Sequence, residues 1–499
     1  MRWLILASLA LAGCHRRPAP PTAPSVALAV VGDDAKLRRD EPLPSRSPIF
    51  DGTTVRLRGA RGETLGLQVL THGRARVALT LPPTVARVDG FRLRYLEVRD
   101  PSTAMYGGSR GAGAWPDPLE PAALPVAGDA LFDVVIAADA PPGLQRGALT
   151  VDGRAIAVEL TVERLRLDVA AAPLVWIWYQ PGEIARAHGL ADEDAALLPL
   201  ERRYHALARA HGAYFASDLP PARFEARVGL MAGTRYWPVR LDDGAPAAVL
   251  RAAADGWDRR FARLPQTAFT IPVDEPQTAA ARAEARRLGE AIGPHAKLLR
   301  AVTAAPAPDL AGAIDVFLSP ASRPPHRWTY NGAPPSAGSL VIDTDGTALR
   351  TWGWIALRYG VELWHVWEGT YFADRYNGGG ATRVLEEPLT FDQRRKPLAR
   401  PDWGNGDGVL VYPGAGPGRD GPWPSLRLKA LRRGLQDRAL MQALIACGVA
   451  EAVDRELRAL VPRALDEARG AAAWPADSAA WDAARGRLYD AWRARCAHE

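Results

Sequence analysis

Two patterns of apolar and polar residues divide the chain. Up to about residue 167, apolar and polar residues alternate in short segments separated by turn residues, as at 54–58, 75–81 and 155–162. Such period-2 alternation is typical of strands with one buried face, and its repetition at short intervals predicts an antiparallel β-sandwich. We assign this domain to residues 26–168.

After residue 173, apolar strands alternate with amphipathic helices. This alternation is typical of a parallel sheet, and its length favours a closed (β/α)8 barrel over residues 173–423. An open doubly wound sheet is the alternative, although no Gly-rich phosphate turn follows the first strand. Residues 424–499 are predicted to form a helical tail, in which an amphipathic run at 426–445 packs back on the barrel. The sequence predicts strands at 174–179, 213–215, 267–273, 297–302, 314–318, 339–343 and 361–367, and helices at 198–211, 247–264, 277–292 and 346–359.

The first residues have the features of an export signal. One early cation precedes a short apolar run that ends in small residues before Cys14. The run is too short to span a bilayer, so it predicts a signal peptide over residues 1–13. Residues 11–14, Leu-Ala-Gly-Cys, resemble the bacterial lipobox, which implies a lipid anchor on Cys14 in the cell envelope; an ordinary signal peptide is the alternative. By the same resemblance His15 favours the outer membrane, and a Pro-rich tether follows at 14–25.

Composition narrows the chemistry. Of the 499 residues, 47% are hydrophobic and 24% are charged, which is the usage of a globular rather than a disordered protein. The formal net charge is +6, but no Lys/Arg cluster is interleaved with aromatic residues, so no nucleic-acid partner is predicted. Besides Cys14, the cysteines are Cys447 and Cys496. In an oxidising compartment these two either form a disulfide between C-terminal helices or stay as two buried thiols.

Several classes of site are excluded. The nine histidines are scattered, without a His-Glu-x-x-His motif, and no Gly-x-x-x-x-Gly-Lys-Ser/Thr loop is present. We therefore predict neither a metal nor a cofactor. Residues 107–111 match the Gly-x-Ser-x-Gly motif of serine hydrolases, but they lie in the β-sandwich region rather than at a strand-turn-helix junction. We interpret them as a flexible loop.

The candidate site is a pair of adjacent carboxylates. Asp274 and Glu275 follow the predicted strand at 267–273, and the catalytic residues of a parallel barrel lie at the C-terminal ends of its strands. Neighbouring residues that leave a strand point in different directions, so the two carboxyl groups address different substrate atoms. The alternative is structural: Asp274 caps the helix that begins near Pro276, and Glu275 interacts with the positive end of that helix.

From residue 271 on, the order of motifs resembles the catalytic domain of glycoside hydrolase family 123, and the preceding sandwich resembles the N-terminal domain of that family. The Gly-Asp-Gly and Pro-Ser-Leu-Arg motifs are the most specific, and the resemblance covers most of the mature chain. The motifs are Ile-Pro-Val-Asp-Glu-Pro at 271–276, Arg-Trp-Thr-Tyr at 327–330, Val-Ile-Asp at 341–343, an aromatic helix at 352–359, Gly-Asp-Gly-Val-Leu-Val-Tyr-Pro-Gly at 406–414 and Pro-Ser-Leu-Arg at 424–427.

The resemblance implies hydrolysis of a β-linked N-acetylhexosaminide, with N-acetylgalactosamine favoured. It implies retention through attack by the substrate's own 2-acetamido oxygen, an exception to the scheme with two catalytic carboxylates. Glu275 would be the general acid, and Asp274 would orient the acetamido group and stabilise the positive charge that develops. Tyr330 would hydrogen-bond the acetamido carbonyl. Arg350 would pair with Asp343 near the site, or the two would form a structural ion pair in the barrel wall.

Tryptophans concentrate in the predicted catalytic segment. Eleven of the 16 lie between residues 176 and 423, and sugar rings pack their C–H faces on aromatic faces. Trp352 and Trp354, in a predicted helix, are expected to pack in the core. The tryptophans near predicted strand ends are our candidates for sugar binding: Trp178, Trp328, Trp364 and Trp367.

Residues 364–371 depart from the family pattern, because an Asn expected in many relatives is missing. His365 and Glu368 are polar substitutes, and Glu368 either contacts substrate or forms an ion pair. Two hypotheses follow. The first is an exported, lipid-anchored glycoside hydrolase, and the second is a catalytically inactive glycan-binding or structural lipoprotein with the same fold. The intact pair of Asp274 and Glu275 favours the first.

Overall fold

The computed structural model describes residues 27–73, 75–192, 194–415 and 420–496; the predicted signal peptide, Cys14 and the predicted tether lie outside the described residues. The N-terminal part contains two five-stranded sheets with the orders β1-β3-β8-β5-β6 and β2-β10-β9-β4-β7. Their ladders are antiparallel except for that of β2 with β10, which the alternation did not predict to be parallel. The strands are β1 (Ala29–Gly32), β2 (Thr54–Arg61), β3 (Thr64–Leu70), β4 (Arg76–Thr80), β5 (Ala86–Val98), β6 (Gly113–Pro121), β7 (Val126–Ala127), β8 (Ala130–Ile136), β9 (Gly143–Val151) and β10 (Arg154–Arg166).

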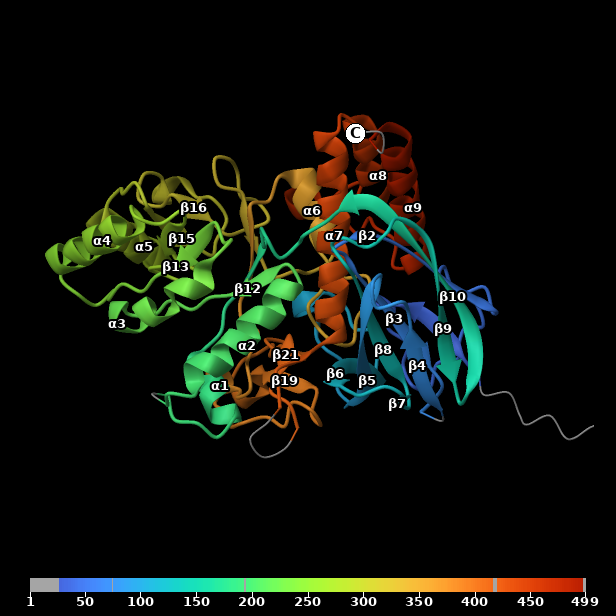
Figure 1. The fold of residues 1–499 in the computed structure, drawn as a ribbon. Coiled ribbons are helices and arrows are strands. Elements are labelled where there is room, and N and C mark those ends of the chain that lie inside the picture. Colours follow the sequence, from blue (N-terminus) through green and yellow to red (C-terminus); the bar gives the residue numbers. More distant parts are fainter. Residues whose placement is uncertain (1–26, 74, 193, 416–419, 497–499) are drawn as a thin grey trace, which may run out of the picture.

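The two sheets share one apolar core. Alternate side chains of the first sheet, such as Leu67 of β3 and Phe132 of β8, meet alternate side chains of the second, such as Leu79 of β4 and Leu160 of β10. Period-2 alternation predicts this burial of one face, because successive side chains of a strand point to opposite sides of its sheet. The sheets, blue and teal in Figure 1, lie on one side of the molecule.

Eight short parallel strands form the centre of the other part. Hydrogen bonds join them into two four-stranded sheets, β12-β11-β18-β17 and β13-β14-β15-β16, and a single parallel bridge from Leu318 to Trp328 links the end of β16 to β17. The strands are β11 (Val175–Ile177), β12 (Ala213–Phe215), β13 (Tyr236–Pro238), β14 (Thr267–Thr270), β15 (Leu298–Val302), β16 (Val316–Phe317), β17 (Trp328–Tyr330) and β18 (Leu363–Val366).

The predicted closed (β/α)8 barrel is not confirmed. Within the described residues no ladder joins β12 to β13, although Tyr214 Oη donates to Tyr236 O at 3.0 Å across this gap. The helices are uneven too, since only the 3-10 turn η3 (Pro308–Leu310) separates β15 from β16. Besides η3, the helices between residues 170 and 360 are α1 (Pro181–Ala187), α2 (Leu197–Ala210), α3 (Pro221–Phe224), η2 (Glu225–Met231), α4 (Ala247–Phe261), α5 (Ala279–Ile292) and α6 (Thr351–Tyr359).

The predicted strand at 339–343 does not form, and the segment is irregular. Ile342 N donates to Asn405 O at 2.9 Å, and Ile342 O accepts from Lys36 Nζ at 2.9 Å. Buried backbone groups must find partners. Here the partners are Lys36 of the N-terminal part and Asn405, the last residue of the short strand β20 (Trp403–Asn405), rather than a strand of the parallel sheets.

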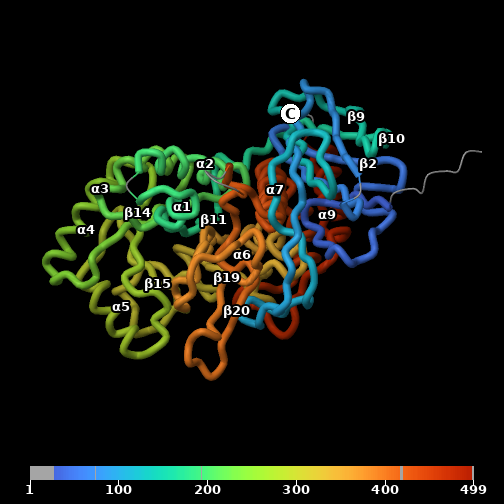
Figure 2. Tube along the Cα trace, turned by 90° about the horizontal axis from the view of Figure 1, so that it is seen from below, coloured from blue at the N-terminus to red at the C-terminus, as the bar shows by residue number. Residues whose placement is uncertain are grey.

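Short hairpins follow β18 and lead to the C-terminal helices. The hairpin of β19 and β20, orange in Figure 2, lies between the parallel strands and the N-terminal sheets. It is bonded to the N-terminal part, where Thr103 N donates to Trp403 O at 3.0 Å. The remaining elements are β19 (Leu389–Asp392), β20 (Trp403–Asn405), β21 (Val411–Tyr412), β22 (Trp423–Pro424), η4 (Arg375–Asn377), η5 (Gln393–Arg395), α7 (Leu426–Ala446), α8 (Ala450–Leu460), η6 (Leu465–Glu467) and α9 (Ser478–Arg495).

Helix α7 lies between the two parts of the molecule (Figure 1) and is buried around its whole first half. The prediction of an amphipathic helix is wrong there, because the charged face of α7 is covered by acids of the N-terminal sheets. These buried pairs tie the two parts together, and truncating one partner of such a pair leaves an unpaired buried charge. The pairs are Arg427 with Asp117, Lys429 and Arg432 with Asp133, and Arg433 with Glu63.

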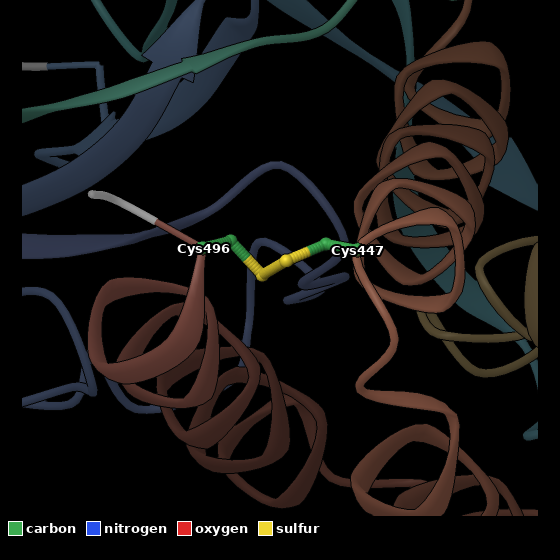
Figure 3. Close-up of a disulfide and its surroundings, with 2 residues drawn as sticks. All are labelled: Cys447 and Cys496. Carbon is green, nitrogen blue, oxygen red and sulfur yellow. A yellow bond between two sulfur atoms is a disulfide. The ribbon is translucent and has the colours of Figure 1, made fainter. Parts of the chain in front are cut away.

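A disulfide joins the C-terminal helices. Cys447 directly follows α7 and Cys496 directly follows α9, and their Cα atoms are 6.0 Å apart (Figure 3). The sequence left a disulfide and two free thiols open, and the structure has the disulfide. It fastens the last helix to the central one.

Candidate active site

A cavity of about 550 Å³ opens at the C-terminal ends of the parallel strands. This is the edge at which parallel α/β folds place their catalytic groups, because all strands end there and their following loops converge. The residue directly after each of six strands lines the cavity: Trp178, Val239, Ile271, Thr303, Asn331 and Trp367.

Asp274 and Glu275 both line this cavity and are exposed to it. β14 ends before the predicted strand does, so the two carboxylates lie on a loop rather than at the strand's last residue. Helix α5 is capped by Thr278, whose side chain accepts a hydrogen bond from Ala281 N. The alternative in which Asp274 caps this helix is therefore wrong.

The backbone of Glu275 is in the left-handed region, with φ of 44°. For a residue with a Cβ atom this conformation costs on the order of 1–3 kcal/mol and persists only where neighbouring contacts hold it. Thr303 supplies those contacts. Its Oγ1 accepts from Glu275 N at 2.7 Å and donates to Asp274 Oδ1. One threonine thus fixes both members of the pair, and strain of this kind is typical of functional sites.

Tyr330 is the side chain that reaches Glu275. Its Oη donates to Glu275 Oε1 at 2.9 Å. Burial, followed by the negative charge of Glu275, raises the pKa of the Tyr330 phenol, so the group stays a proton donor at neutral pH. The structure therefore brings together Asp274, Glu275 and Tyr330, the three residues that the sequence selected for the reaction.

Two indoles from neighbouring strands, Trp178 after β11 and Trp367 after β18, form part of the cavity wall, and each is oriented by a carboxylate. Trp178 Nε1 donates to Asp218 Oδ1 at 2.9 Å, and Trp367 Nε1 donates to Asp407 Oδ1 at 2.7 Å. Both tryptophans are half-buried. Half-buried indoles held in one orientation present flat apolar faces to the cavity, which suits the C–H face of a sugar.

His365 and Glu368 differ in their relation to the cavity. His365 lines it and stacks on Trp176, with ring centroids 3.9 Å apart; burial lowers its pKa to about 3, so the ring is neutral. Glu368 is fully buried and pairs with Arg375 at 2.7 Å, while burial raises its pKa to about 7. Of the two roles left open for Glu368, the ion pair is the one that the structure has.

Trp328 and Trp364 are core residues, which contradicts their predicted role in sugar binding. Both are 0% exposed. Trp328 packs edge-on against Phe269 at 5.0 Å, and Trp364 stacks on Trp352 at 4.3 Å. They lie at the first and second positions of their strands, two residues before the strand ends at which the cavity opens, and their side chains are in the core.

The predicted pair of Asp343 and Arg350 does not exist, and neither residue lines the cavity. Asp343 Oδ1 accepts from Ser102 Oγ at 2.6 Å. Arg350 is fully buried and pairs with Asp437 at 2.8 Å and with Asp34 at 2.7 Å. Both side chains bind partners that are remote in sequence, so no local pattern could reveal the pairing.

Sequence reasoning missed several cavity residues. Thr303 and Asn331 each follow a strand directly, so the rule that selected Asp274 could have found them. Asn331 Oδ1 accepts from the backbone N–H of Trp367 at 3.0 Å and fixes the start of that loop. Asp407, from the Gly-Asp-Gly motif, does not line the cavity but bonds the cavity residue Trp367; it is 0% exposed, and burial raises its pKa to about 7.

Among the described residues, no group of three or more His, Cys, Asp or Glu side chains could hold a metal ion. Nor does any helix in the described ranges have the length and apolar character needed to cross a membrane. The groups that the cavity offers a ligand include carboxylates, phenols, indoles, a neutral imidazole, and the side chains of Arg240 and Asn331.

Adjacent carboxylates beside a phenol, in a cavity lined by indoles at the C-terminal ends of parallel strands, suit acid–base chemistry on a ligand with apolar faces. The comparisons with known proteins point to one family of glycoside hydrolases. Residues 322–444 match the family Glycoside hydrolase 123, catalytic domain.

Among solved structures, a family 123 glycoside hydrolase from Clostridium perfringens, studied for glycolipid glycan hydrolysis, is 12% identical, with a TM-score of 0.65 over 94% of this chain and 98% of that chain. An FMN-binding beta-glucuronidase from Facaelibacterium prausnitzii L2-6 is 8% identical over 62% of this chain and 54% of that chain, with a TM-score of 0.21, which is too low to compare the folds. No curated protein matches the chain in sequence.

The predicted resemblance to glycoside hydrolase family 123, and with it the prediction of a glycoside hydrolase, is confirmed by the sequence match and the shared fold. The matched range contains Tyr330, Trp367 and Asp407 but not Asp274 or Glu275. The two carboxylates lie outside the matched segment in sequence, but the hydrogen bond from Tyr330 to Glu275 joins them to it in space.

Proposed function

We propose that the protein hydrolyses a β-linked N-acetylhexosaminide, with N-acetylgalactosamine as the favoured sugar, and retains the anomeric configuration. The observation that carries the proposal is the place of Asp274 and Glu275, adjacent to each other in a cavity with indole walls at the C-terminal ends of parallel strands. The match of residues 322–444 to the catalytic domain of glycoside hydrolase 123 supports the same class of reaction.

In the proposed reaction Glu275 gives its proton to the leaving glycosidic oxygen. The acetamido oxygen of the substrate attacks the anomeric carbon and forms an oxazolinium ring, which water then opens from the face that the leaving group vacated, with Glu275 as base. Asp274 accepts the acetamido N–H and stabilises the positive charge of the ring. Thr303, bonded to both residues, keeps the two carboxylates in their relative positions.

Tyr330 changes partner in this scheme. In the structure its hydroxyl donates a hydrogen bond to Glu275 Oε1. This oxygen belongs to the carboxyl group that must approach the glycosidic oxygen. When substrate binds, the Tyr330 hydroxyl donates its hydrogen bond to the acetamido carbonyl instead, and Glu275 is free to donate its proton to the leaving oxygen. The Tyr330 hydroxyl then polarises the acetamido carbonyl, whose oxygen attacks the anomeric carbon. Trp178 and Trp367 pack against the apolar C–H surface of the sugar ring.

The first test is a panel of 4-nitrophenyl β-glycosides. We expect release of 4-nitrophenol from the N-acetylgalactosaminide or the N-acetylglucosaminide, and little from the matched galactoside and glucoside, which lack the assisting acetamido group. Full activity on the 2-hydroxy sugars would refute assistance by the substrate. Proton NMR of the first-formed product reports the anomer directly, and an inverted product would refute retention.

The second test separates the roles of the carboxylates. Glu275→Gln should lower kcat about 10²–10⁴-fold for a phenyl glycoside, whose leaving group needs a proton, and much less for a 2,4-dinitrophenyl glycoside, which leaves without one. Asp274→Asn should lower kcat for both. Glu284→Gln, an exposed substitution on α5, is the matched control. Equal losses of Glu275→Gln on both substrates would show that Glu275 is not the acid.

The second hypothesis, an inactive glycan-binding or structural lipoprotein, is tested by the same reagents. If the wild type and Glu275→Gln are equally inert over the whole panel, yet glycan binding is measured by calorimetry, the enzyme proposal fails. The backbone strain at Glu275, with φ of 44°, favours the hypothesis of an active enzyme, because such strain is typical of catalytic sites and glycan binding alone does not require it.

We also propose export and a lipid anchor on Cys14, with the outer membrane as the favoured site, since the first residues resemble a lipoprotein signal. Palmitate labelling that disappears in Cys14→Ala would support this, and unlabelled wild type would refute it. For the fold, we propose that the eight parallel strands form a distorted (β/α)8-type barrel around the cavity. The strand order and the Leu318 to Trp328 bridge support this arrangement.

A further inference from the structure

One loop of the N-terminal part reaches the catalytic cavity. It joins β5 to β6 and contains the short 3-10 helix η1 (Ala104–Tyr106). Met105 and Tyr106 line the cavity together with Glu275 and Tyr330. Met105 is 40% exposed, whereas Tyr106 is only 7% exposed. A domain without catalytic carboxylates therefore supplies part of the wall of the site.

A single buried carboxylate holds both ends of this loop. Asp343, at 0% exposure, accepts from Ser102 N at 2.7 Å and Ser102 Oγ at 2.6 Å, before η1. It also accepts from Ser109 Oγ at 2.5 Å, after η1. The backbone carbonyl of Asp343 accepts from Arg110 N at 2.8 Å. Since the two serines flank Tyr106, the carboxylate fixes the width of the loop and hence the position of its tip.

Two further contacts press the loop against the catalytic part. Thr103 Oγ1 donates to Asp402 Oδ1 at 2.7 Å. Gly107, at φ of 92°, lies so close to Pro334 that a Cβ atom would come within 2.5 Å of its Cδ, so only glycine fits this contact. Residues 107–111 form a loop, as predicted, and Ser109 and Arg110 within it are bonded to Asp343. Ser109 of that motif is a clamp hydroxyl bonded to Asp343, rather than a nucleophile.

Tyr106 presents a hydroxyl that the protein does not use. Among the described residues none forms a hydrogen bond with its Oη, and this oxygen is not one of the fully buried atoms that lack a partner. The oxygen is therefore accessible, and because Tyr106 lines the cavity and its phenol interacts electrostatically with Glu275 and Tyr330, the cavity is the side from which a ligand reaches it. Burial and the charges of Asp407 and Glu275 raise the pKa of the phenol, which keeps it a proton donor beside two acidic side chains.

We propose that Tyr106 is a substrate-binding residue whose hydroxyl donates a hydrogen bond to a hydroxyl of the bound hexosamine, and that Asp343 positions it by clamping Ser102 and Ser109. This inference rests on the proposed function for the identity of the sugar. It gives the N-terminal part a direct role in recognition, and it explains why Asp343 is fully buried at the boundary between the two parts rather than paired with an arginine.

The first experiment removes only the hydroxyl. Tyr106→Phe should lower kcat/KM for the 4-nitrophenyl N-acetylhexosaminide about 10-fold, mainly by raising KM, because one hydrogen bond to the bound sugar is lost. Its melting temperature should stay that of the wild type, since Oη has no protein partner to lose. Tyr95→Phe is the matched control: Tyr95 also belongs to the N-terminal part, bonds Asp129 at 3.0 Å and lies outside the cavity lining. Unchanged kcat/KM in Tyr106→Phe would overturn the inference.

The second experiment asks whether Asp343 acts through Tyr106. Asp343→Asn replaces an acceptor by a donor that faces Ser102 N–H or Ser109 O–H, and should lower kcat/KM about 10-fold in the wild-type background. In the Tyr106→Phe background Asp343→Asn should lower kcat/KM less than about twofold, because the hydroxyl that Asp343 positions is already absent. Ser109→Ala, which removes one clamp hydroxyl, serves if Asp343→Asn does not fold. Equal losses in both backgrounds would show a merely structural role.

Binding of free N-acetylgalactosamine, measured by calorimetry, separates failure of this inference from failure of the proposed function. Weaker binding by Tyr106→Phe than by Tyr95→Phe supports the inference even if no glycoside is cleaved, and that result would overturn only the proposed function. Glycoside cleavage by the wild type with equal binding by both variants would leave the proposed function standing and overturn the inference.

Discussion

Replacing Asp407 by Asn should change how the stability of the protein depends on pH. Asp407 is 0% exposed, its Oδ1 accepts from Trp367 Nε1 at 2.7 Å, and no described atom bonds its Oδ2. Burial raises its pKa from the ordinary 3.8 to about 7. Asn keeps an oxygen acceptor for Trp367 and removes the titration, so the variant isolates the cost of ionising this carboxyl group in the folded state.

The sign follows from proton binding. Between pH 3.8 and about 7 the folded protein keeps a proton that the unfolded chain has released, so wild-type stability falls as the pH rises through this window. About three pKa units at about 1.4 kcal/mol each give an upper limit of about 4 kcal/mol. The unfolding free energy of Asp407→Asn minus that of the wild type should therefore rise by up to this amount from pH 4 to pH 7, and stay constant above pH 8.

Melting temperatures of the two proteins, measured at each pH from 4 to 8, test this prediction. At about 2.1 cal/mol/K of unfolding entropy per residue, 1 kcal/mol moves the midpoint of a chain of this length by about 1 °C, so the difference should grow by about 4 °C across the window. Asp454→Asn, an exposed substitution on α8, should show no such growth. A difference between Asp407→Asn and the wild type that does not vary with pH would refute the reasoning, because Asp407 would then titrate alike in the folded and unfolded states.

Two further predictions concern the C-terminal helices. Asp437→Ala should lower the unfolding free energy in urea by about 3–5 kcal/mol, because it removes the 2.8 Å partner of the fully buried Arg350. Asp454→Ala, on an exposed pair, should cost less than about 1 kcal/mol, and equal effects of the two variants would contradict this account. Replacing Cys447 and Cys496 by Ser should cost about 4 kcal/mol, since 49 residues separate them. A reductant should then lower the melting temperature of the wild type but not that of the variant.

The candidate site was predictable where chemistry follows the end of a strand. The apolar run before Asp274 marks a buried strand, and the rule that catalytic groups follow strands selected this residue and Glu275. Tyr330, at the end of another strand, came from the motif that it belongs to. All three line one cavity. Local pattern sufficed here because a parallel arrangement brings every strand end to the same edge.

The same reasoning failed where partners are remote. Asp343 is bonded to Ser102, 241 residues away, and Arg350 to Asp34, 316 residues away. No pattern along the chain predicts such contacts, because they depend on how the N-terminal sheets pack against the catalytic part. The tryptophans show the limit in another way, since Trp328 lies only two residues before Tyr330 in β17 and yet is fully buried in the core.

The sequence by itself determined the alternation of strands and helices, the position of the carboxylate pair after a strand and the family resemblance, because these depend on periodicity and on residues adjacent in the chain. Tertiary structure alone decided the burial of the charged face of α7, the irregular segment at 339–343 and the approach of Tyr106 to the cavity. Each of these needs surfaces from both parts of the molecule, and the free energy of such contacts is set by burial and partner geometry that a linear pattern does not contain.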